Sequence, residues 1–262
     1  MTLVAAPNLA RIPAGDFLMG APDAEADQRP VHRVTIGEFL IGRFPVTNDE
    51  YAKFLRATGH APPAIGDLPV IASGPLEDMF REMAAPYEWQ GGYPPPGHGS
   101  HPVVLVRYAD AIAYCAWSSE TTGRSVRLPT EAEWEKAARG GAEGKRYPWG
   151  DDFDPGGCCY LPDAAAKRQR GTRPTGTYPP NSYGLCDMIG NVWEWVSDWY
   201  DEESYGRDDR HDPHGPHEGS LRVVRGGSWV TDDITMLRCA YRHKVPPDTY
   251  AYSIGFRIAC NA

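Results

Sequence analysis

Hydrophobic and polar residues alternate along this chain in short runs, and no run shows a helical or strand periodicity over a long stretch. Several runs join apolar and β-branched side chains and are bounded by Gly or Pro, a pattern typical of short strands. The segments predicted as strands on this basis are 10–20, 32–41, 101–106, 223–224, 237–241 and 254–258. Much of 142–220 shows little periodicity, so we expect long ordered loops there.

Two sequence signatures mark the starts of helices. Thr47 with Glu50, and Thr130 with Glu133, match the capping box, in which a hydroxyl and a carboxylate three residues apart satisfy the first free amide groups. Another helix is expected over 109–117, where apolar side chains recur every three to four residues.

The breaks between these elements indicate the fold class. Gly140 is expected to end the helix that begins after Thr130, and the Pro- and Gly-rich residues 57–100 predict a long surface excursion. Two main helices and many short antiparallel strands give an α+β fold that is low in regular secondary structure. Neither a repeat nor a linker interrupts residues 1–262, so a single domain is predicted.

Composition and charge narrow the possible partners. Of the 262 residues, 41% are hydrophobic, and 8 Trp and 14 Tyr supply large side chains for a core. The net charge of −9 argues against nucleic acid or an anionic membrane, because both are bound through clustered Lys and Arg. No apolar run approaches the roughly 20 residues of a membrane span. No secretory signal is visible, so a cytoplasmic location is expected.

The six cysteines do not form a C-x-x-C pair. In a reducing compartment most of them are expected to be free thiols. Cys158 and Cys159 are adjacent, which leaves open a strained vicinal disulfide or a metal site whose other ligands the sequence does not identify.

Eight segments along the chain form one collinear set of motifs. They include the strings RLPTEAEWE, YPWG, GNVWEW and RVVRGGSW, and they cover 12–20, 44–48, 101–104, 127–135, 147–150, 190–195, 222–229 and 254–257. Together they resemble the formylglycine-generating-enzyme, or sulfatase-modifying-factor, family, over nearly the whole chain. The resemblance implies a much-elaborated C-type-lectin-like fold.

Most charged residues of these motifs are predicted to be structural. Arg127, Glu131, Glu133 and Arg257 have the chemistry of catalytic acids or anion binders. Buried Arg and Glu partners that hold loops together are the favoured interpretation.

One motif carries a candidate calcium site. Asp187 and Glu194 lie seven residues apart with a glycine between them, and calcium takes six to eight oxygen ligands from carboxylates and carbonyls. The resemblance implies a structural Ca²⁺ held by the side chains of Asp187 and Glu194 and the carbonyls of Gly190 and Val192. The alternative is that Glu194 caps local backbone and Asp187 is exposed. A second calcium site of the family is not expected, because 167–170 carries cations where a carboxylate would be needed.

The resemblance also shows what this chain lacks. The family's true formylglycine generators bind copper(I) through two cysteines five apart and oxidise a substrate cysteine with O₂. The matching positions are Thr231 and Met236, and Cys239 is the only thiol nearby. Because copper(I) prefers soft thiolate ligands, neither copper nor formylglycine generation is expected here.

Two functions remain open. The first is an oxidative metal-dependent enzyme of another kind, for which the resemblance to iron-dependent relatives suggests Fe²⁺. His211, His214 and His217 are the only dense set of candidate ligands. The competing interpretation is a surface loop with incidental histidines, because the prolines in this segment favour an extended chain that scatters side chains.

The second function is a calcium-stabilised ligand- or protein-binding module that takes a small molecule or a peptide. Lectin-like folds present variable loops on a rigid frame, and aromatic side chains with polar tips suit such ligands. Arg238 and Arg242 are able to share a face and bind a carboxylate, although a structural salt bridge is the favoured role. The predicted pocket residues are Trp193, Ser228, Trp229, Thr231, Met236, Arg238, Arg242 and Tyr252. The sequence does not predict an oligomeric state.

Overall fold

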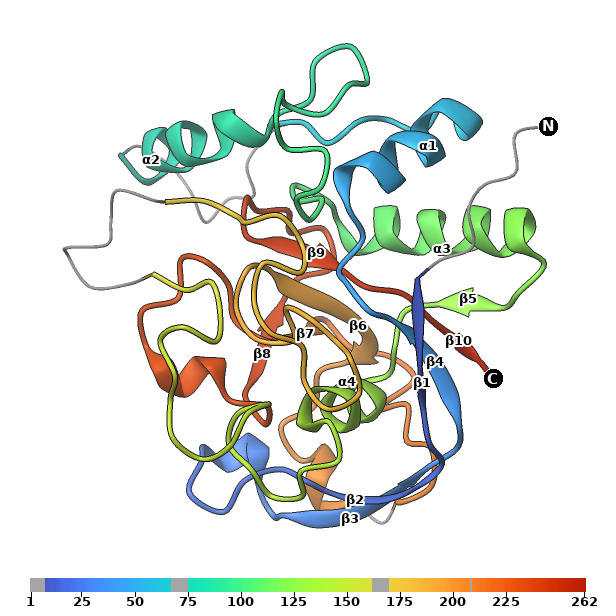
Figure 1. Cartoon of the computed structure of the whole chain (residues 1–262), viewed down its shortest axis with the longest axis vertical. Coiled ribbons are helices and arrows are strands. Elements are labelled where there is room, and N and C mark those ends of the chain that lie inside the picture. The colour runs from blue at the N-terminus through green and yellow to red at the C-terminus, as the bar shows by residue number, and fades with distance from the viewer. Residues whose placement is uncertain (1–7, 67–74, 162–169, 208) are drawn as a thin grey trace.

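The structure is a computed structural model that describes residues 8–66, 75–161, 170–207 and 209–262 (Figure 1). Its first sheet has four short strands in the order β1-β4-β10-β5, all pairs antiparallel. The first and last strands of the described chain, β1 and β10, both pair with β4, so this sheet brings the two ends of the described chain together. The strands are β1 (Leu9–Ile12), β4 (Phe39–Gly42), β10 (Ala259–Asn261) and β5 (Val126–Arg127).

Two further sheets complete the β structure. One is the hairpin of β2 (Gly15–Met19) and β3 (His32–Ile36), which lies at the bottom of Figure 1. The other has the order β8-β7-β6-β9, in which β6 and β9 are parallel and the remaining pairs antiparallel. Its strands are β6 (Trp193–Trp199), β7 (Arg222–Arg225), β8 (Arg242–Val245) and β9 (Ile254–Phe256).

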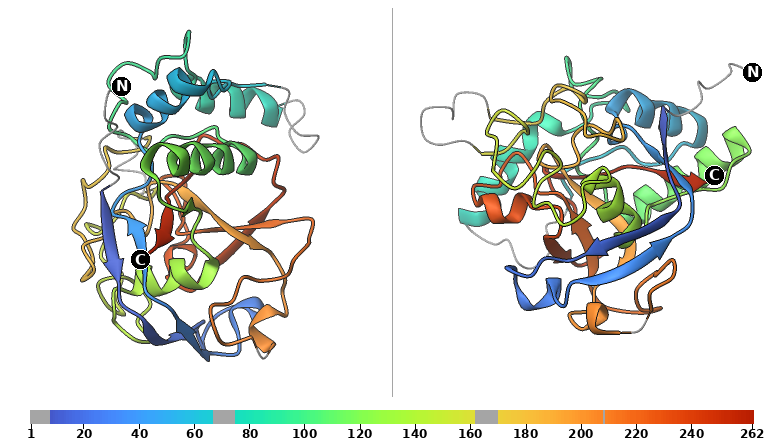
Figure 2. Two further views of the ribbon diagram at one scale, coloured as in Figure 1. Left: turned by 90° about the vertical axis from the view of Figure 1, so that its right-hand side faces the viewer. Right: turned by 60° about the horizontal axis from the view of Figure 1, so that its bottom comes forward.

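The described residues contain four α-helices: three lie at the predicted sites, and one, α2, was not expected. They are α1 (Asn48–Thr58), α2 (Pro75–Ala84), α3 (Tyr108–Thr122) and α4 (Glu131–Arg139). The first three lie together at one end of the molecule, above the β6 sheet, whereas α4 lies on the other side near the β2–β3 hairpin (Figures 1 and 2). Short 3₁₀ turns cover Ala26–Gln28, Ala85–Tyr87, Ser204–Gly206 and Ile234–Leu237.

Local signals for the helices are confirmed. The Glu50 amide donates to the Thr47 hydroxyl at 3.3 Å, and the Glu133 amide donates to the Thr130 hydroxyl at 3.1 Å. In each capping box the glutamate carboxylate accepts a hydrogen bond from the backbone amide of the threonine. Gly140 ends α4 with φ 58°, a left-handed conformation that glycine adopts without steric cost.

Several predicted strands differ from the observed ones. The runs 10–20 and 32–41 each form two strands, and the first is broken at Gly15, whose φ is 134°. Residues 101–106 are not a regular strand and make only a single bridge, between Pro102 and Thr47. Residues 237–241 do not form the predicted strand: residue 237 ends a 3₁₀ turn, and the strand β8 begins only at residue 242.

The sequence pattern missed two regular elements. The strand β6 lies within 142–220. Five of its first six residues, Trp193 to Asp198, are buried, so the strand shows no alternation of buried and exposed positions that a sequence pattern would reveal. The helix α2 lies in the excursion 57–100, where flanking Pro and Gly masked it. Among the described residues, no helix has both the length and the apolar character needed to cross a membrane.

Candidate functional site

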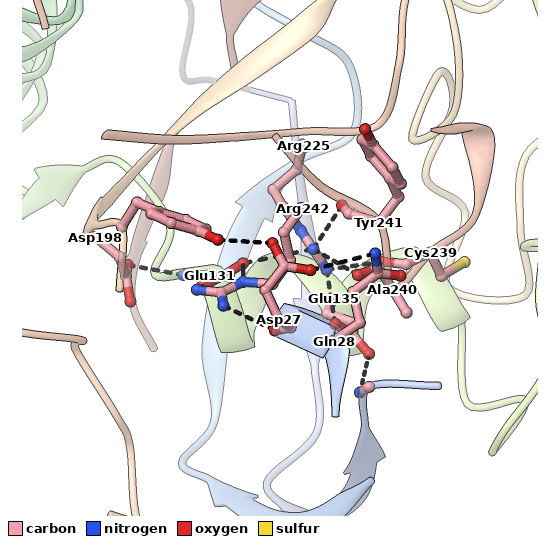
Figure 3. Close-up of polar contacts among 12 residues, drawn as sticks. Asp27, Gln28, Glu131, Glu135, Asp198, Arg225, Cys239, Ala240, Tyr241 and Arg242 are labelled. Carbon is pink, nitrogen blue, oxygen red and sulfur yellow. Dashed lines mark hydrogen bonds and ion pairs between the residues drawn. The ribbon is translucent and has the colours of Figure 1, made fainter. Parts of the chain in front are cut away.

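The charged residues of the motifs meet in a buried ion-pair centre made by Glu131, Glu135, Arg139, Arg225 and Arg242. Figure 3 shows all of these except Arg139 by label. Glu135 lies at the middle of the centre. One oxygen accepts from Arg225 Nη2 at 2.6 Å and the other from Arg139 Nη2 at 2.7 Å. Burial alone would raise the pKa of Glu135, but the two guanidinium groups bring that pKa below its usual value.

The same centre ties loops to helix α4. Arg242 binds Glu131 with two parallel bonds of 2.8 Å each. Arg225 also donates to three successive backbone carbonyls, those of 239, 240 and 241. Because every charge has an opposite partner and the bonds run to backbone, this centre is structural scaffolding, as predicted for Glu131.

The other predicted partners behave in the same way. Arg127 binds Glu133 through two bonds of 2.6 and 2.7 Å. Arg257 binds Glu194 through two bonds of 2.7 Å and donates to the carbonyls of three further residues. The structural role predicted for these arginines and glutamates is confirmed.

The 187–194 loop holds an unusual carboxylate. Asp187 is buried with φ 55°, and one of its oxygens accepts from the Gly176 amide at 2.7 Å. The other oxygen, Oδ1, is buried without a hydrogen-bond partner. Burial raises the pKa of Asp187 to about 6. A buried, half-satisfied carboxylate is costly unless a cation or proton completes it.

Glu194 faces the same loop but is already held. Trp134 Nε1 donates to Glu194 Oε2 at 2.7 Å, in addition to the two bonds from Arg257. Its Oε1 accepts only one bond, and a carboxylate oxygen has room for two. The orphaned Asp187 oxygen and this spare capacity on Glu194 fit a calcium ion. Asp187 is buried rather than exposed, so the exposed alternative for it is wrong.

A second cluster, which we call the aromatic site, consists of Phe80, Tyr87, Trp229, Tyr250 and Tyr252. The Trp229 ring lies 5.7 Å from that of Tyr252 and 6.2 Å from that of Tyr87. Phe80 reaches over from α2, 5.4 Å from Tyr252 and 6.0 Å from Tyr250. Phe80 and Tyr252 are only partly buried, so the site reaches the surface.

The two positions that match the copper cysteines follow Trp229 in the chain. Thr231 is buried, and its hydroxyl oxygen accepts from the Ser228 amide at 3.0 Å. The Thr231 carbonyl accepts from Leu161 at 2.8 Å. Met236 is partly buried against the cluster that contains Trp193. The hard hydroxyl of Thr231 is therefore engaged inside the protein, and no thiolate pair exists at these positions.

The predicted pocket is brought together only in part. Trp229 and Tyr252 belong to the aromatic site, and Ser228 and Thr231 adjoin it in sequence. Trp193 packs elsewhere, with its ring 5.0 Å from His243 and 6.0 Å from Tyr241.

The two arginines of the predicted pocket are also turned away from the aromatic site. Arg242 is committed to Glu131 in the ion-pair centre, which confirms the salt bridge favoured from the sequence. Arg238 approaches Asp23, with 3.5 Å between Nη1 and Oδ2. Arg242 is therefore not free to bind a ligand carboxylate, whereas Arg238 makes only long contacts with Asp23 among the described residues, and its Nε has no hydrogen-bond partner there.

The histidine loop gives no support to an iron site. His211 lies beside Thr35 of β3 in a short parallel bridge, whereas His214 and His217 are exposed. Within the described ranges, no three His, Cys, Asp or Glu side chains gather in a way that would hold a metal ion. Residues 167–169, on which the expected loss of a second calcium site depends, lie outside the described residues.

The cysteines are free thiols throughout the described part of the chain. Cys158 packs into the cluster around Trp134, and Cys159 packs into the cluster around Trp229. The adjacent pair therefore divides between two sides of the chain and does not form a disulfide. Burial raises the pKa of Cys239 to about 12, so the one thiol near Thr231 in sequence is protonated in the core.

Sequence reasoning missed two groups of residues that shape these sites. Glu135 and Arg225 lie 90 positions apart, and no local spacing joins them. Phe80 and Tyr87 of the aromatic site come from the Pro- and Gly-rich excursion, where no helix was expected. The exposed apolar residues of α2 at helical spacing, Leu76 and Met79, were the signal that could have found it.

Comparison with known proteins agrees with this geometry. The sequence profile of the sulfatase-modifying factor enzyme 1-like domain matches residues 2–262. A formylglycine-generating enzyme of Streptomyces coelicolor is 38% identical, and the match covers 96% of this chain and 88% of that protein. A Bos taurus protein named inactive C-alpha-formylglycine-generating enzyme 2 is 35% identical over 97% of this chain and 88% of its own length.

A solved structure shares both fold and sequence. PvdO from Pseudomonas aeruginosa superposes with a TM-score of 0.80 at 31% identity, and the match covers 98% of this chain and 95% of that one. Treponema denticola variable protein 1 has a TM-score of 0.73 at 24% identity, a likeness of fold alone, with 97% of this chain and 95% of that one covered. The chain has the predicted C-type-lectin-like α+β fold and belongs to the formylglycine-generating-enzyme, or sulfatase-modifying-factor, family.

Proposed function

We propose that this protein does not generate formylglycine and that its aromatic site binds an apolar or aromatic group of a peptide or small molecule. The observation that carries the proposal is the pair of residues Thr231 and Met236 in place of two thiolates. Thr231 also has its hydroxyl bonded to the Ser228 amide, so it offers no open ligand atom. A family relative whose name calls it inactive supports the idea that the fold persists without this reaction.

The aromatic site has the chemistry for such a ligand. Trp229 is fixed, because its Nε1 donates to the Tyr252 carbonyl at 3.0 Å. Tyr252 and Phe80 remain partly open, and the Arg107 guanidinium lies 5.1 Å from the centre of the Tyr250 ring. Rigid aromatic side chains supply contact area at low cost in conformational entropy, which suits recognition of an apolar group.

An oxidative metal-dependent enzyme is the second candidate, and one observation favours it. Cys159 places a thiol in the cluster that surrounds Trp229. Burial raises the pKa of this thiol to about 11, so a bound metal would have to displace its proton. Iron or another redox metal would supply the oxidising chemistry, but the described residues gather no three His, Cys, Asp or Glu side chains that would hold it with Cys159.

Structural calcium is part of the proposal. Asp187 and Glu194 would supply carboxylate oxygens, with the carbonyls of Gly190 and Val192 beside them. The unpartnered Asp187 Oδ1 is the structural reason to expect a cation. The ion would fix the 187–194 loop and with it the start of β6, which carries Trp193.

Calorimetric titration with N-acetyl-Phe-Phe-amide tests the aromatic site. Tyr252→Ala is expected to weaken binding at least about fivefold, because one aromatic contact is worth about 1 kcal/mol. Tyr93→Ala, which removes an exposed tyrosine outside the site, is the matched control and should leave binding unchanged. No saturable binding, or an equal loss in both variants, would overturn the proposal.

Elemental analysis and oxygen uptake separate the two candidates. The binding proposal expects calcium but neither retained iron or copper nor O₂ consumption after Fe(II) loading. Stoichiometric redox metal with O₂ consumption that falls in Cys159→Ser would instead establish the oxidative candidate.

A further inference from the structure

A small pocket lies at the other end of the molecule from the aromatic site, and the histidine loop forms one of its walls. Its cavity volume is about 90 Å³. Asp198 of β6 and the first residues of α4 line one side, and Pro213, Gly215 and Pro216 line the other. The loop that sequence patterns suggested as a metal site therefore encloses a pocket with its backbone and prolines.

A buried carboxylate with one unused oxygen lines this pocket. Asp198 is 4% exposed, and its Oδ2 accepts from the Glu131 amide at 2.8 Å and the Ser197 hydroxyl at 3.0 Å. None of the described side chains or amides donates to Oδ1. A Cβ built on Gly215 would lie 3.2 Å from Oδ1, so this oxygen faces the glycine that lines the pocket.

Nearby cations do not satisfy that oxygen. Arg242 donates two hydrogen bonds to the Glu131 carboxylate and two more to backbone carbonyls. Arg222 donates to the Ser197 carbonyl and lies over the Trp199 ring. Arg207 is paired with Asp201. Each of these guanidinium groups bonds to another group, although Arg222 Nε itself has no hydrogen-bond partner in the described part of the chain, and together they offset part of the charge on Asp198.

The remaining polar groups of the pocket are suited to a hydrogen-bond donor. The His32 Nδ1–H donates to the Pro30 carbonyl at 2.8 Å, which leaves the Nε2 lone pair of the neutral ring. Burial lowers the pKa of His32, which favours the neutral ring. Ser204, which also lines the pocket, has a buried hydroxyl oxygen without a partner.

From this arrangement we propose that the pocket binds a primary ammonium group, with Asp198 Oδ1 as its anionic acceptor and His32 Nε2 and Ser204 Oγ as neutral acceptors. An ammonium has three donors and a compact charge, which suits a small pocket whose lining residues include these three acceptors. The group belongs either to a free small amine or to a lysine side chain of a peptide. This site is separate from the aromatic site and does not depend on the function proposed there.

The charge state of Asp198 makes the binding depend on pH. Glu131, Arg242, Arg222 and Tyr108 face Asp198, and burial together with Glu131 raises its pKa to about 7. An alkyl ammonium stays protonated well above that value. Affinity should therefore rise as pH goes from 6 to 8, because the carboxylate that accepts the ammonium becomes ionised over this range.

Titration of ¹⁵N-labelled protein with ethylammonium chloride tests the site, at ionic strength held constant with NaCl. Saturable amide shifts are expected at Ala132, Ser204 and Gly215, all of which line the pocket. Ethanol, a neutral ligand of similar size, should give no comparable shifts. Nα-acetyl-lysinamide distinguishes the sources, because tighter binding than that of ethylammonium indicates a peptide lysine and weaker binding a free amine.

Asp198→Asn supplies the decisive variant. The amide oxygen still accepts from Glu131 and Ser197, so the N-terminus of α4 stays capped, while the charge is lost. We expect affinity to fall at least about tenfold and its rise between pH 6 and 8 to disappear. Asp154→Asn removes the same charge at an exposed position and should have no effect.

Two results would overturn the proposal. One is the absence of saturable shifts in the unaltered protein, or equal shifts with ethanol. The other is undiminished binding in a folded Asp198→Asn variant. Should that variant unfold, the pH series and the ethanol comparison on the unaltered protein still decide the matter.

Discussion

The ion-pair centre and the aromatic site differ in the kind of contacts their side chains make and in their exposure to solvent. In the centre, Glu135 and Arg225 are wholly buried and every charge meets an opposite one. In the aromatic site, rings contact rings, and Phe80 and Tyr252 stay partly open to solvent. The residues that look most catalytic in the sequence are thus fully used inside the protein, whereas the less conspicuous aromatic residues are the ones a ligand is able to reach.

The difference teaches how this fold separates stability from function. Arginines that bond to several backbone carbonyls fix long loops that have few strands to hold them. The segment directly after Trp229 holds Thr231 and Met236 outside the ion-pair centre, and the Thr231 hydroxyl accepts from the Ser228 amide.

Breaking the ion-pair centre should have the largest effect. Glu135→Gln leaves Arg139 without its carboxylate partner and Arg225 with Glu131 alone, at 3.4 Å, and we expect the free energy of unfolding to fall by about 3–5 kcal/mol. Glu77→Gln is a matched control, because Glu77 and Arg81 have the same four-residue spacing on an exposed helix. Its expected cost is below about 1 kcal/mol. Urea denaturation measures both, and equal losses would contradict the contrast between buried and exposed pairs.

Calcium should have the next largest effect. At a concentration 100 times its Kd, Ca²⁺ is expected to stabilise the protein by about 2.7 kcal/mol at pH 7.5. Without the ion, the raised pKa of Asp187, about 6, means that its contribution to stability is present near pH 4 and is lost by pH 6. Since the ion needs the ionised form, its stabilising effect should shrink at pH 5.

Asp187→Asn should remove this calcium effect, whereas Asp151→Asn, at an exposed carboxyl, should retain it. Thermal melts with and without EGTA measure the difference. A calcium effect of the same size at pH 5 and pH 7.5, or one retained in Asp187→Asn, would exclude this loop as the site.

Two buried tryptophans allow a charged and a neutral hydrogen-bond acceptor to be compared directly. Trp134 Nε1 donates to the Glu194 carboxylate, and Trp229 Nε1 donates to the Tyr252 carbonyl. Trp134→Phe should cost about 1 kcal/mol more than Trp229→Phe, because bonds to charged groups contribute more and leave a larger penalty when lost. Equal costs in urea denaturation would show that the charge of the acceptor does not matter here.

The histidine loop should give the smallest effect. His214→Ala and His217→Ala change exposed residues, and each should alter the free energy of unfolding by less than about 0.5 kcal/mol. Metal content should not change. A loss of bound iron in either variant would restore the redox-metal hypothesis for this loop.

The sequence predicted what is local. The capping boxes of α1 and α4 and the glycine that ends α4 involve residues within a few positions of each other, so spacing alone finds them. The family motifs located β7 and the Arg–Glu partners. In contrast, β6 is buried on both faces and has no alternation, and α2 is hidden by its flanking Pro and Gly.

The candidate sites were less predictable for the same reason. The partner of Glu135 is 90 positions away, and Phe80 joins Trp229 only through the fold. Trp193 and Arg242 were predicted to share a pocket with Trp229, yet packing places them in other clusters. The pocket around Asp198 gathers residues from β2, β3, α4, β6 and the segments after β6, and no motif joins them.

We propose that Thr231 and Met236, at the positions where the family resemblance implies a thiolate pair, leave this chain without copper chemistry on the family fold. The most direct measurement is a competition for Cu(I) between the protein and bathocuproine disulfonate, followed by assay of a cysteine peptide for formylglycine. We predict that the protein neither withdraws Cu(I) nor converts the peptide, whereas the double variant Thr231→Cys, Met236→Cys withdraws one Cu(I). Cu(I) capture with peptide conversion by the unaltered protein would contradict the claim.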